Sequence, residues 1–284
     1  MKITHIYHSG FLVELENSLL LFDWYKGTLP ELDADKTLYV FCSHSHPDHY
    51  SRKIWELQNS HPNVVYILDE GIEEASSHPE SRVITVSPRK AYAIFPDGSF
   101  SSLMAGTDTK AGHAGTVQGE SPATGSSGSD GSDTSDRDPA MILRTLVSTD
   151  MGVAFYVETE EKRIYHAGDL NVWFWNDEPM EDNLASEKKC RGEMQFLADQ
   201  LRSAADQENG DSAGSLIDVA FVPLDPRLEE HAPRCIEAFM EILGAETVFP
   251  MHYWSRLDET RLYLNDKRIS AYTPVICFDS QKEL

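Results

Sequence analysis

Three histidines and an aspartate follow directly after an apolar run early in the chain, and this feature most constrains the fold. The run Leu38–Phe41 leads into Cys42-Ser43-His44-Ser45-His46-Pro47-Asp48-His49. Successive side chains of an extended chain point to opposite sides, so His44 and His46 share one side. Pro47 keeps His46 out of the helical region. The pattern therefore predicts a strand that ends in two imidazoles able to bind one metal ion.

Beyond Pro47 the chain is expected to form a helix over Ser51–Gln58, which aims Asp48 and His49 away from the first pair of histidines. This arrangement allows a second ion. A single histidine is usually a surface or core residue, but four ligand-type residues within six positions are far from chance. Imidazole and carboxylate ligands suit zinc, iron or manganese rather than calcium.

The cluster resembles the His-x-His-x-Asp-His motif of the metallo-β-lactamase superfamily. Three further segments resemble that superfamily in order, so that nearly the whole chain is covered: Leu19-Leu20-Leu21-Phe22-Asp23, Ile164-Tyr165-His166-Ala167-Gly168-Asp169 and Val248-Phe249-Pro250-Met251-His252. The resemblance implies six metal ligands, which are His44, His46, Asp48, His49, Asp169 and His252. It also implies that Asp169 bridges two ions and that Asp23 accepts a hydrogen bond from a ligand imidazole, which fixes the tautomer.

One departure from the superfamily concerns its third motif, which usually contains a further histidine. This chain has Ser148-Thr149-Asp150 at that place. Asp150 can substitute as an oxygen donor, water can fill the position, or only the second site holds metal tightly. His113 is another candidate ligand, although its Gly/Ser-rich surroundings lack the rigid support that a ligand needs. The opening His5–Val13 and the segment Ser148–Val153 are most similar to the ascorbate-phosphate lactonase-like branch.

The composition limits the partners and the location that can be expected. The chain has 284 residues and a formal net charge of −23. Binding to phosphate backbones depends on clustered lysine and arginine, so nucleic acid is a disfavoured partner and a small-molecule substrate is expected. The four scattered cysteines form no C-x-x-C pair, which predicts reduced thiols in a cytoplasmic protein. No apolar run reaches membrane-spanning length, so no membrane association is expected.

A single domain over residues 1–284 is predicted from the order of the apolar segments. Strands are expected at 3–7, 11–15, 19–23, 38–42, 64–68, 83–86, 91–95, 153–158, 163–166, 219–222 and 247–249, and helices at 186–205 and 232–243. Strands followed by alternating strands and helices predict two sheets with helices outside. The resemblance implies an α+β fold, the four-layer αββα sandwich of two mixed sheets known as the metallo-β-lactamase fold.

The composition changes to Gly, Ser, Thr and Asp between about residues 106 and 139. Such a segment has too little apolar surface to offset its ordering entropy. We expect a flexible insertion within the domain. A lid over the site is the alternative, but the segment lacks the aromatic residues that a lid would use to cover a substrate.

The ligand set predicts a hydrolase that uses a metal-activated water. A divalent ion lowers the pKa of water from about 15.7 to near 7 and polarises a carbonyl or phosphoryl oxygen. Asp48 is expected to orient the nucleophile and protonate the leaving group, in addition to or instead of ligation, a role that the resemblance also suggests. The expected substrate is an ester, lactone or phosphodiester of a small molecule, and the expected cofactor is one or two zinc ions, or manganese or iron.

A different class of function also fits the sequence. A non-hydrolytic metal-binding sensor or scaffold with a degraded first metal site is favoured by the missing third-motif histidine. Four residues are candidates for substrate contact: His8, Trp173, Trp175 and Arg227. His8 either contacts substrate, supports a ligand or packs in a loop, and the two tryptophans either wall a pocket or close the core. Arg227 and its neighbour Asp225 are similarly ambiguous, although an arginine beside a dinuclear site can receive a phosphate or carboxylate.

Overall fold

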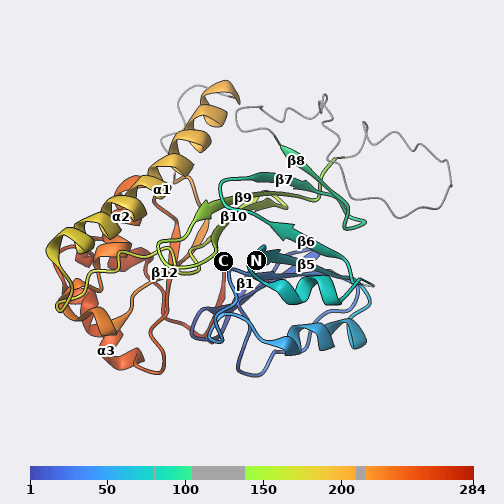
Figure 1. Cartoon of the computed structure of the whole chain (residues 1–284), viewed down its shortest axis with the longest axis horizontal. Coiled ribbons are helices and arrows are strands. Elements are labelled where there is room, and N and C mark those ends of the chain that lie inside the picture. The colour runs from blue at the N-terminus through green and yellow to red at the C-terminus, as the bar shows by residue number, and fades with distance from the viewer. Residues whose placement is uncertain (80, 104–137, 209–214) are drawn as a thin grey trace.

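The computed structural model describes residues 1–79, 81–103, 138–208 and 215–284. Within these residues two seven-stranded mixed β-sheets pack face to face, and helices cover their outer faces (Figure 1). The expected four-layer αββα sandwich is confirmed. The expected insertion at 106–139 and the candidate His113 fall almost wholly outside the described residues.

The first sheet has the strand order β14-β1-β2-β3-β4-β5-β6. Neighbouring strands are antiparallel from β14 to β3 and parallel from β3 to β6. The strands are β1 (Lys2–Tyr7), β2 (Gly10–Glu14), β3 (Ser18–Phe22), β4 (Thr37–Cys42), β5 (Val64–Asp69), β6 (Val83–Val86) and β14 (Gln281–Glu283). Because β14 pairs with β1, the two ends of the chain lie side by side (Figure 1).

The second sheet has the order β13-β12-β11-β10-β9-β7-β8. Its strands β11, β12 and β13 are parallel, and the others are antiparallel. The strands are β7 (Ala91–Ile94), β8 (Phe100–Leu103), β9 (Met141–Val147), β10 (Val153–Thr159), β11 (Lys162–His166), β12 (Val219–Pro223) and β13 (Thr247–Met251). The aromatic rings of Phe11 and Phe221 contact each other in a tilted arrangement between the sheets, with centroids 4.2 Å apart, which shows how closely the inner faces pack.

Helices cover the outer face of each sheet. The α-helices are α1 (Met180–Glu208), α2 (Arg234–Ile242) and α3 (Leu257–Leu262), and the 3₁₀ helices are η1 (Arg52–Asn59), η2 (Glu73–Ser77), η4 (Pro226–His231), η5 (Tyr263–Asn265) and η6 (Ser270–Val275). Ile54, Trp55 and Leu57 of η1 pack on β3 and β4, where Cys42 is buried. The helix expected at 51–58 is therefore present, but as a 3₁₀ helix that Ser51 caps.

Candidate metal centre

The predicted site residues gather where the parallel strands of both sheets end. Asp23 and His44 follow β3 and β4 of the first sheet, while Asp169 and His252 follow β11 and β13 of the second. In open α/β sheets, ligands likewise bind just outside the carboxyl ends of the strands, where the loops from neighbouring strands meet. The fold thus brings together residues that are far apart in the sequence.

Two glycines let the sheets approach closely at this end. A Cβ atom on Gly152 would lie 2.0 Å from the Ser43 carbonyl oxygen, and one on Gly168 would lie 2.8 Å from Ser43 Cβ. Both glycines also have positive φ angles, of 72° and 51°. Val153 N donates to the Ser43 carbonyl oxygen at 3.0 Å, so the loop that carries His44 is fastened to the second sheet.

The His44 group consists of His44, His46 and Asp169, whose ligand atoms lie within 4.8 Å of one another. His44 Nε2 is 2.9 Å from His46 Nδ1 and 3.4 Å from Asp169 Oδ2. The side chain of His44 is buried, whereas that of His46 is 37% exposed. This group is therefore open to solvent on one side.

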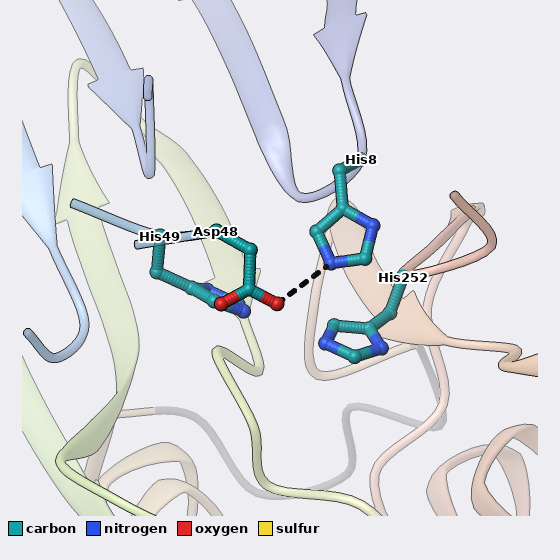
Figure 2. Close-up of side chains that lie close together, drawn as sticks. All are labelled: His8, Asp48, His49 and His252. Atoms are coloured by element: carbon teal, nitrogen blue, oxygen red, sulfur yellow. Dashed lines mark ion pairs between the residues drawn. The ribbon is translucent and has the colours of Figure 1, made fainter. Parts of the chain in front are cut away.

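The His49 group consists of His8, Asp48, His49 and His252, and its ligand atoms also lie within 4.8 Å of one another (Figure 2). All three imidazoles are buried, and the carboxylate of Asp48 is 23% exposed. His8 Nε2 lies 3.6 Å from Asp48 Oδ2, and the rings of His8 and His252 are 4.2 Å apart. His8, expected to contact substrate, support a ligand or pack in a loop, thus stands among the predicted ligands.

Asp169 lies between the two groups. Its Oδ2 faces His44, while its Oδ1 is 3.1 Å from His49 Nε2 and 3.2 Å from His252 Nε2. A carboxylate can serve two ions because each of its oxygens can act as a donor atom. The division of the two oxygens between the two groups is the arrangement that a bridging ligand requires.

Two buried carboxylates orient the imidazoles of His49 and His252 by accepting hydrogen bonds from the ring nitrogens that point away from the centre. His49 Nδ1 donates to Asp23 Oδ2 at 2.7 Å, which is the hydrogen bond expected for Asp23. Ser43 Oγ donates to the same oxygen at 2.7 Å and lies 3.0 Å from His44 Nδ1. His252 Nδ1 donates to Asp225 Oδ2 at 2.9 Å. Such bonds fix the tautomer and the ring plane, so that the other nitrogen of each ring faces the centre.

The residues fit a metal ion. Five buried atoms at the centre have no hydrogen-bond partner among the described residues: both ring nitrogens of His8, Nε2 of His49, Nε2 of His252 and Oδ1 of Asp169. A buried polar atom without a partner costs about 1–3 kcal/mol. A transition-metal cation would satisfy several of these atoms at once, because imidazole nitrogen and carboxylate oxygen are its preferred donors.

Burial and nearby opposite charges shift the pKa values of the histidines and of Asp169 at the centre. Burial would lower the pKa of His49, but the nearby charges of Asp169 and Asp23 and the hydrogen bond to Asp23 raise it to about 10. Burial lowers the pKa values of His44 and His8 to about 4. Burial would raise the pKa of Asp169, but His49 and His252 hold it well below its usual range. His8 and His44 are therefore neutral at pH 7, as a ligand must be, whereas His49 has to release a proton.

The third-motif position contains no histidine in the structure either. Asp150 lies on the open side of the His44 group, with Oδ2 3.9 Å from His46 Nδ1 and a side chain that is 50% exposed. Its backbone nitrogen donates to Ser148 Oγ at 3.2 Å. Asp150 thus lies beside the group, and its role as a ligand stays a prediction.

A cavity of about 500 Å³ opens beside the centre. It is lined by His46, Asp48, Asp150, Asp169, Trp173, Trp175, Arg227 and His252. The rings of Trp173 and Trp175 are parallel, with centroids 6.1 Å apart, and Trp173 lies 5.7 Å from the ring of His252. The tryptophans thus wall the cavity, which was one of the two expectations for them.

Two residues have clearer roles in the structure than the sequence indicated. Asp225 holds the imidazole of His252 and also accepts hydrogen bonds from Arg227. It lies two residues beyond β12, and Asp23 directly follows β3, so an aspartate near the end of a buried strand is the signal that points to it. His166 is structural: it is fully buried, and its Nε2 lies 2.8 Å from the Ser9 carbonyl oxygen.

Sequence relatives of the chain are distant. No family model matches it. It is 35% identical over 69 residues to a UPF0173 metal-dependent hydrolase of Nanoarchaeum equitans, a match that covers 24% of this chain and 29% of that protein. A UPF0173 metal-dependent hydrolase of Desulforamulus reducens is 24% identical over 256 residues, which are 89% of this chain and 84% of that protein. The first match therefore spans less than a third of its relative's length.

Solved structures of low identity share the fold. Igni18, a metallo hydrolase from Ignicoccus hospitalis, aligns with a TM-score of 0.55 and 15% identity over 100% of this chain and 98% of that one. An isothiocyanate hydrolase from Delia radicum gut bacteria aligns with a TM-score of 0.51 and 11% identity over 100% and 99% of the two chains. CmlA, a diiron β-hydroxylase from Streptomyces venezuelae, has a TM-score of 0.51 and 8% identity, covering 100% of this chain and 53% of CmlA.

These likenesses establish the fold, which is the metallo-β-lactamase fold. They leave the reaction open, because one fold can carry different chemistries, as a hydrolase and a hydroxylase show here. The sequence relatives are named metal-dependent hydrolases, and the solved structures share the fold of this chain. Within the described residues no helix is long and apolar enough to cross a bilayer.

Proposed function

We propose that the chain is a metal-dependent hydrolase that cleaves an ester, lactone or phosphodiester bond of a small molecule. The observation that carries this proposal is the division of the Asp169 carboxylate between two groups of imidazoles beside an open cavity. The names of the UPF0173 relatives, which are called metal-dependent hydrolases, support it.

The two groups would each hold one ion, with Asp169 shared between them. His44, His46 and Asp169 would bind the first ion, with Asp150 as a further oxygen donor, and the second would bind among the ligand atoms of the His49 group. Imidazole and carboxylate donors favour zinc, and manganese or iron also suit them. A bound ion would lower the pKa of water toward 7 and polarise the bond under attack.

Asp48 is placed to transfer the proton of the attacking water to the leaving group. Its carboxylate is part of the cavity wall and is the most exposed acceptor of the His49 group. Burial would raise its pKa, but His8 and His49 hold the pKa well below its usual range. Asp48 Oδ2 is therefore ionised, accepts a proton from the attacking water and returns it to the leaving oxygen when the C–O or P–O bond breaks.

Arg227 suggests an anionic group on the substrate. Its guanidinium lines the cavity in a chain whose net charge is −23 and lies 5.2 Å from the ring of Trp254. A planar guanidinium pairs well with carboxylate or phosphate. We place lactones and other carboxylic esters first, because of the resemblance to the lactonase branch, and phosphodiesters second. β-Lactams are the least favoured.

The test is reconstitution of the metal-free full chain with Zn²⁺, Mn²⁺ or Fe²⁺, followed by assays on lactones, carboxylic esters and phosphodiesters. Asp48→Asn should keep the fold and lower the turnover by about 10²–10⁴-fold. Arg227→Gln should raise KM more for anionic than for neutral substrates, and Arg191→Gln is the control, since Arg191 pairs with Glu241 on the surface. Failure of every reconstituted form to hydrolyse any substrate would refute the proposal.

One observation favours the sensor or scaffold as the second candidate. The third-motif position holds Asp150 on an exposed side of the His44 group instead of a buried histidine. A protein of this kind would bind metal tightly and hydrolyse nothing. Its metal content would then be unchanged in Asp48→Asn, and only a response to metal, such as a change in assembly, would be measurable.

A further inference from the structure

We infer that the imidazole of His8 is a metal ligand in the His49 group, and that Asp48 is thereby left free for proton transfer. This inference rests on the proposed metal centre and deepens it. From the sequence alone, His8 is expected to contact substrate, support a ligand or pack in a loop.

The backbone at His8 is held in an unusual conformation. His8 lies in the short turn between β1 and β2, and its φ of 57° is in the left-handed region. His252, a predicted ligand, has a φ of 63°, and its backbone nitrogen donates to the His8 carbonyl oxygen at 3.4 Å. Non-glycine residues held in this region cost about 1–3 kcal/mol each and gather at functional sites. The two turns therefore aim two imidazoles at one point.

The side chain of His8 is buried without polar partners. It is 0% exposed, and the described part of the chain offers neither of its nitrogens a hydrogen bond. The centroid of its ring lies 4.3 Å from that of the Trp254 ring and 4.2 Å from that of the His252 ring. A phenylalanine would pack equally well at such a place without burying two unpaired nitrogens. Packing alone thus fails to account for a histidine here.

The distance between His8 and Asp48 is longer than that of a hydrogen bond. His8 Nε2 lies 3.6 Å from Asp48 Oδ2 (Figure 2). An N–H···O hydrogen bond usually spans about 2.7–3.2 Å. Two ligand atoms on one zinc ion, each about 2.0–2.2 Å from it, lie about 3–4 Å apart. The ligand atoms of His8, His49 and His252 lie within 4.8 Å of one another, close to this spacing.

His8 would complete the ligand set without Asp48. The unpartnered atoms His8 Nε2, His49 Nε2, His252 Nε2 and Asp169 Oδ1 amount to four donors. Four donors fill a tetrahedral site. Asp48, which faces the cavity, would then keep its carboxylate available for the proton of the substrate water.

The experiment uses the full chain loaded with Co²⁺. Imidazoles bound to Co²⁺ give strongly shifted N–H proton resonances, and a competing chelator measures the affinity of each ion. The variants are His8→Phe, which keeps the aromatic packing, and His8→Gln, in case the first does not fold. The control is His61→Gln, because His61 is also buried but bonds to Asp33 and lies at the amino end of β5, opposite the site.

The wild type should show shifted resonances from four buried imidazoles, those of His8, His44, His49 and His252. Either His8 variant should lose one shifted resonance. It should also bind the ion of the His49 group more than about 100-fold more weakly, which is a larger loss of affinity than the loss of a residue that only positions a ligand causes. His61→Gln should match the wild type.

Three shifted resonances in the wild type, or an unchanged set in His8→Phe, would overturn the assignment of His8 and leave the hydrolase proposal standing. A wild type that binds no Co²⁺ would overturn both, because no metal centre would exist.

Discussion

The two halves of the metal centre differ in how firmly their side chains are held. In the His49 group, His49 and His252 are buried and donate their second ring nitrogens to Asp23 and Asp225 at 2.7 and 2.9 Å. In the His44 group, His46 is 37% exposed and is close to Asp150, which is 50% exposed. One half is therefore enclosed and held by hydrogen bonds, and the other is partly exposed to solvent and open to the cavity.

The difference suggests that the two halves bind their ions with different affinities. A rigid set of donors binds an ion tightly because no ordering of side chains remains to be done. An open set leaves room for a substrate or water beside the ion. We therefore expect a tightly bound ion in the His49 group and an exchangeable ion in the His44 group.

Loss of the shared carboxylate should have the largest effect. Asp169→Asn keeps the size of the side chain but removes the charge that faces His44, His49 and His252. Both ions should bind more than about 100-fold more weakly, beyond the range of a positioning residue, and turnover should fall with them. Metal analysis and the hydrolase assay measure this. Retention of one ion at wild-type affinity would show that Asp169 does not connect the halves.

Loss of either orienting carboxylate should affect the enclosed half next. Asp23→Asn and Asp225→Asn should each lower the affinity of the tight ion by about 10–100-fold, because the ligand ring loses its fixed tautomer and plane. Asp218→Asn is the matched control, since Asp218 pairs with Arg163 at the start of β12, away from the site. Equal affinities in all three variants would contradict the proposed rigidity.

The enclosed half should also respond to pH. Without metal, the pKa of His49 is about 10, above an unfolded value near 6.5. The charged imidazole thus contributes stability that is fully present below about pH 6.5 and is lost as the pH rises toward 10. Metal needs the neutral ring, so affinity for Co²⁺ should rise about tenfold per unit between pH 7 and 9. A flat profile would mean that His49 is already neutral in the metal-free protein.

Changes on the open side should have the smallest effect. Asp150→Ala should lower the affinity of the exchangeable ion only a few-fold, because the carboxylate is half exposed and 3.9 Å from His46. Asp150→His would restore an imidazole at the third motif and should bind that ion more tightly. A decrease in affinity for Asp150→His would indicate that the loop cannot aim an imidazole at the site.

The sequence predicts the parts of the fold that depend on local pattern. Continuous apolar runs identify β3, β4, β5 and β12, since strands buried on both faces carry little else. β8 was missed because its Phe-Ser-Ser-Leu sequence is mostly exposed and has no apolar alternation. β9 was also missed, although its residues alternate, and α1 begins earlier than expected because its first turns are polar and exposed.

The site was predictable where a motif or a strand end marks it. His44, His46, Asp48 and His49 are adjacent in sequence, and Asp169 and His252 follow apolar strands. The place of His8 depends on the turn between β1 and β2 meeting the turn after β13, a contact between the two ends of the chain. No local pattern carries that information, so only the assembled structure brings His8 to the centre.

The most direct test of the account counts metal ions per chain in three proteins after dialysis against a weak chelator. The wild type should retain one ion and take up a second on addition of metal. His46→Ala should still retain the tight ion, whereas His252→Ala should lose it, because only His252 belongs to the enclosed half. Loss of the retained ion in His46→Ala but not in His252→Ala would place the tight site in the open half and contradict the account.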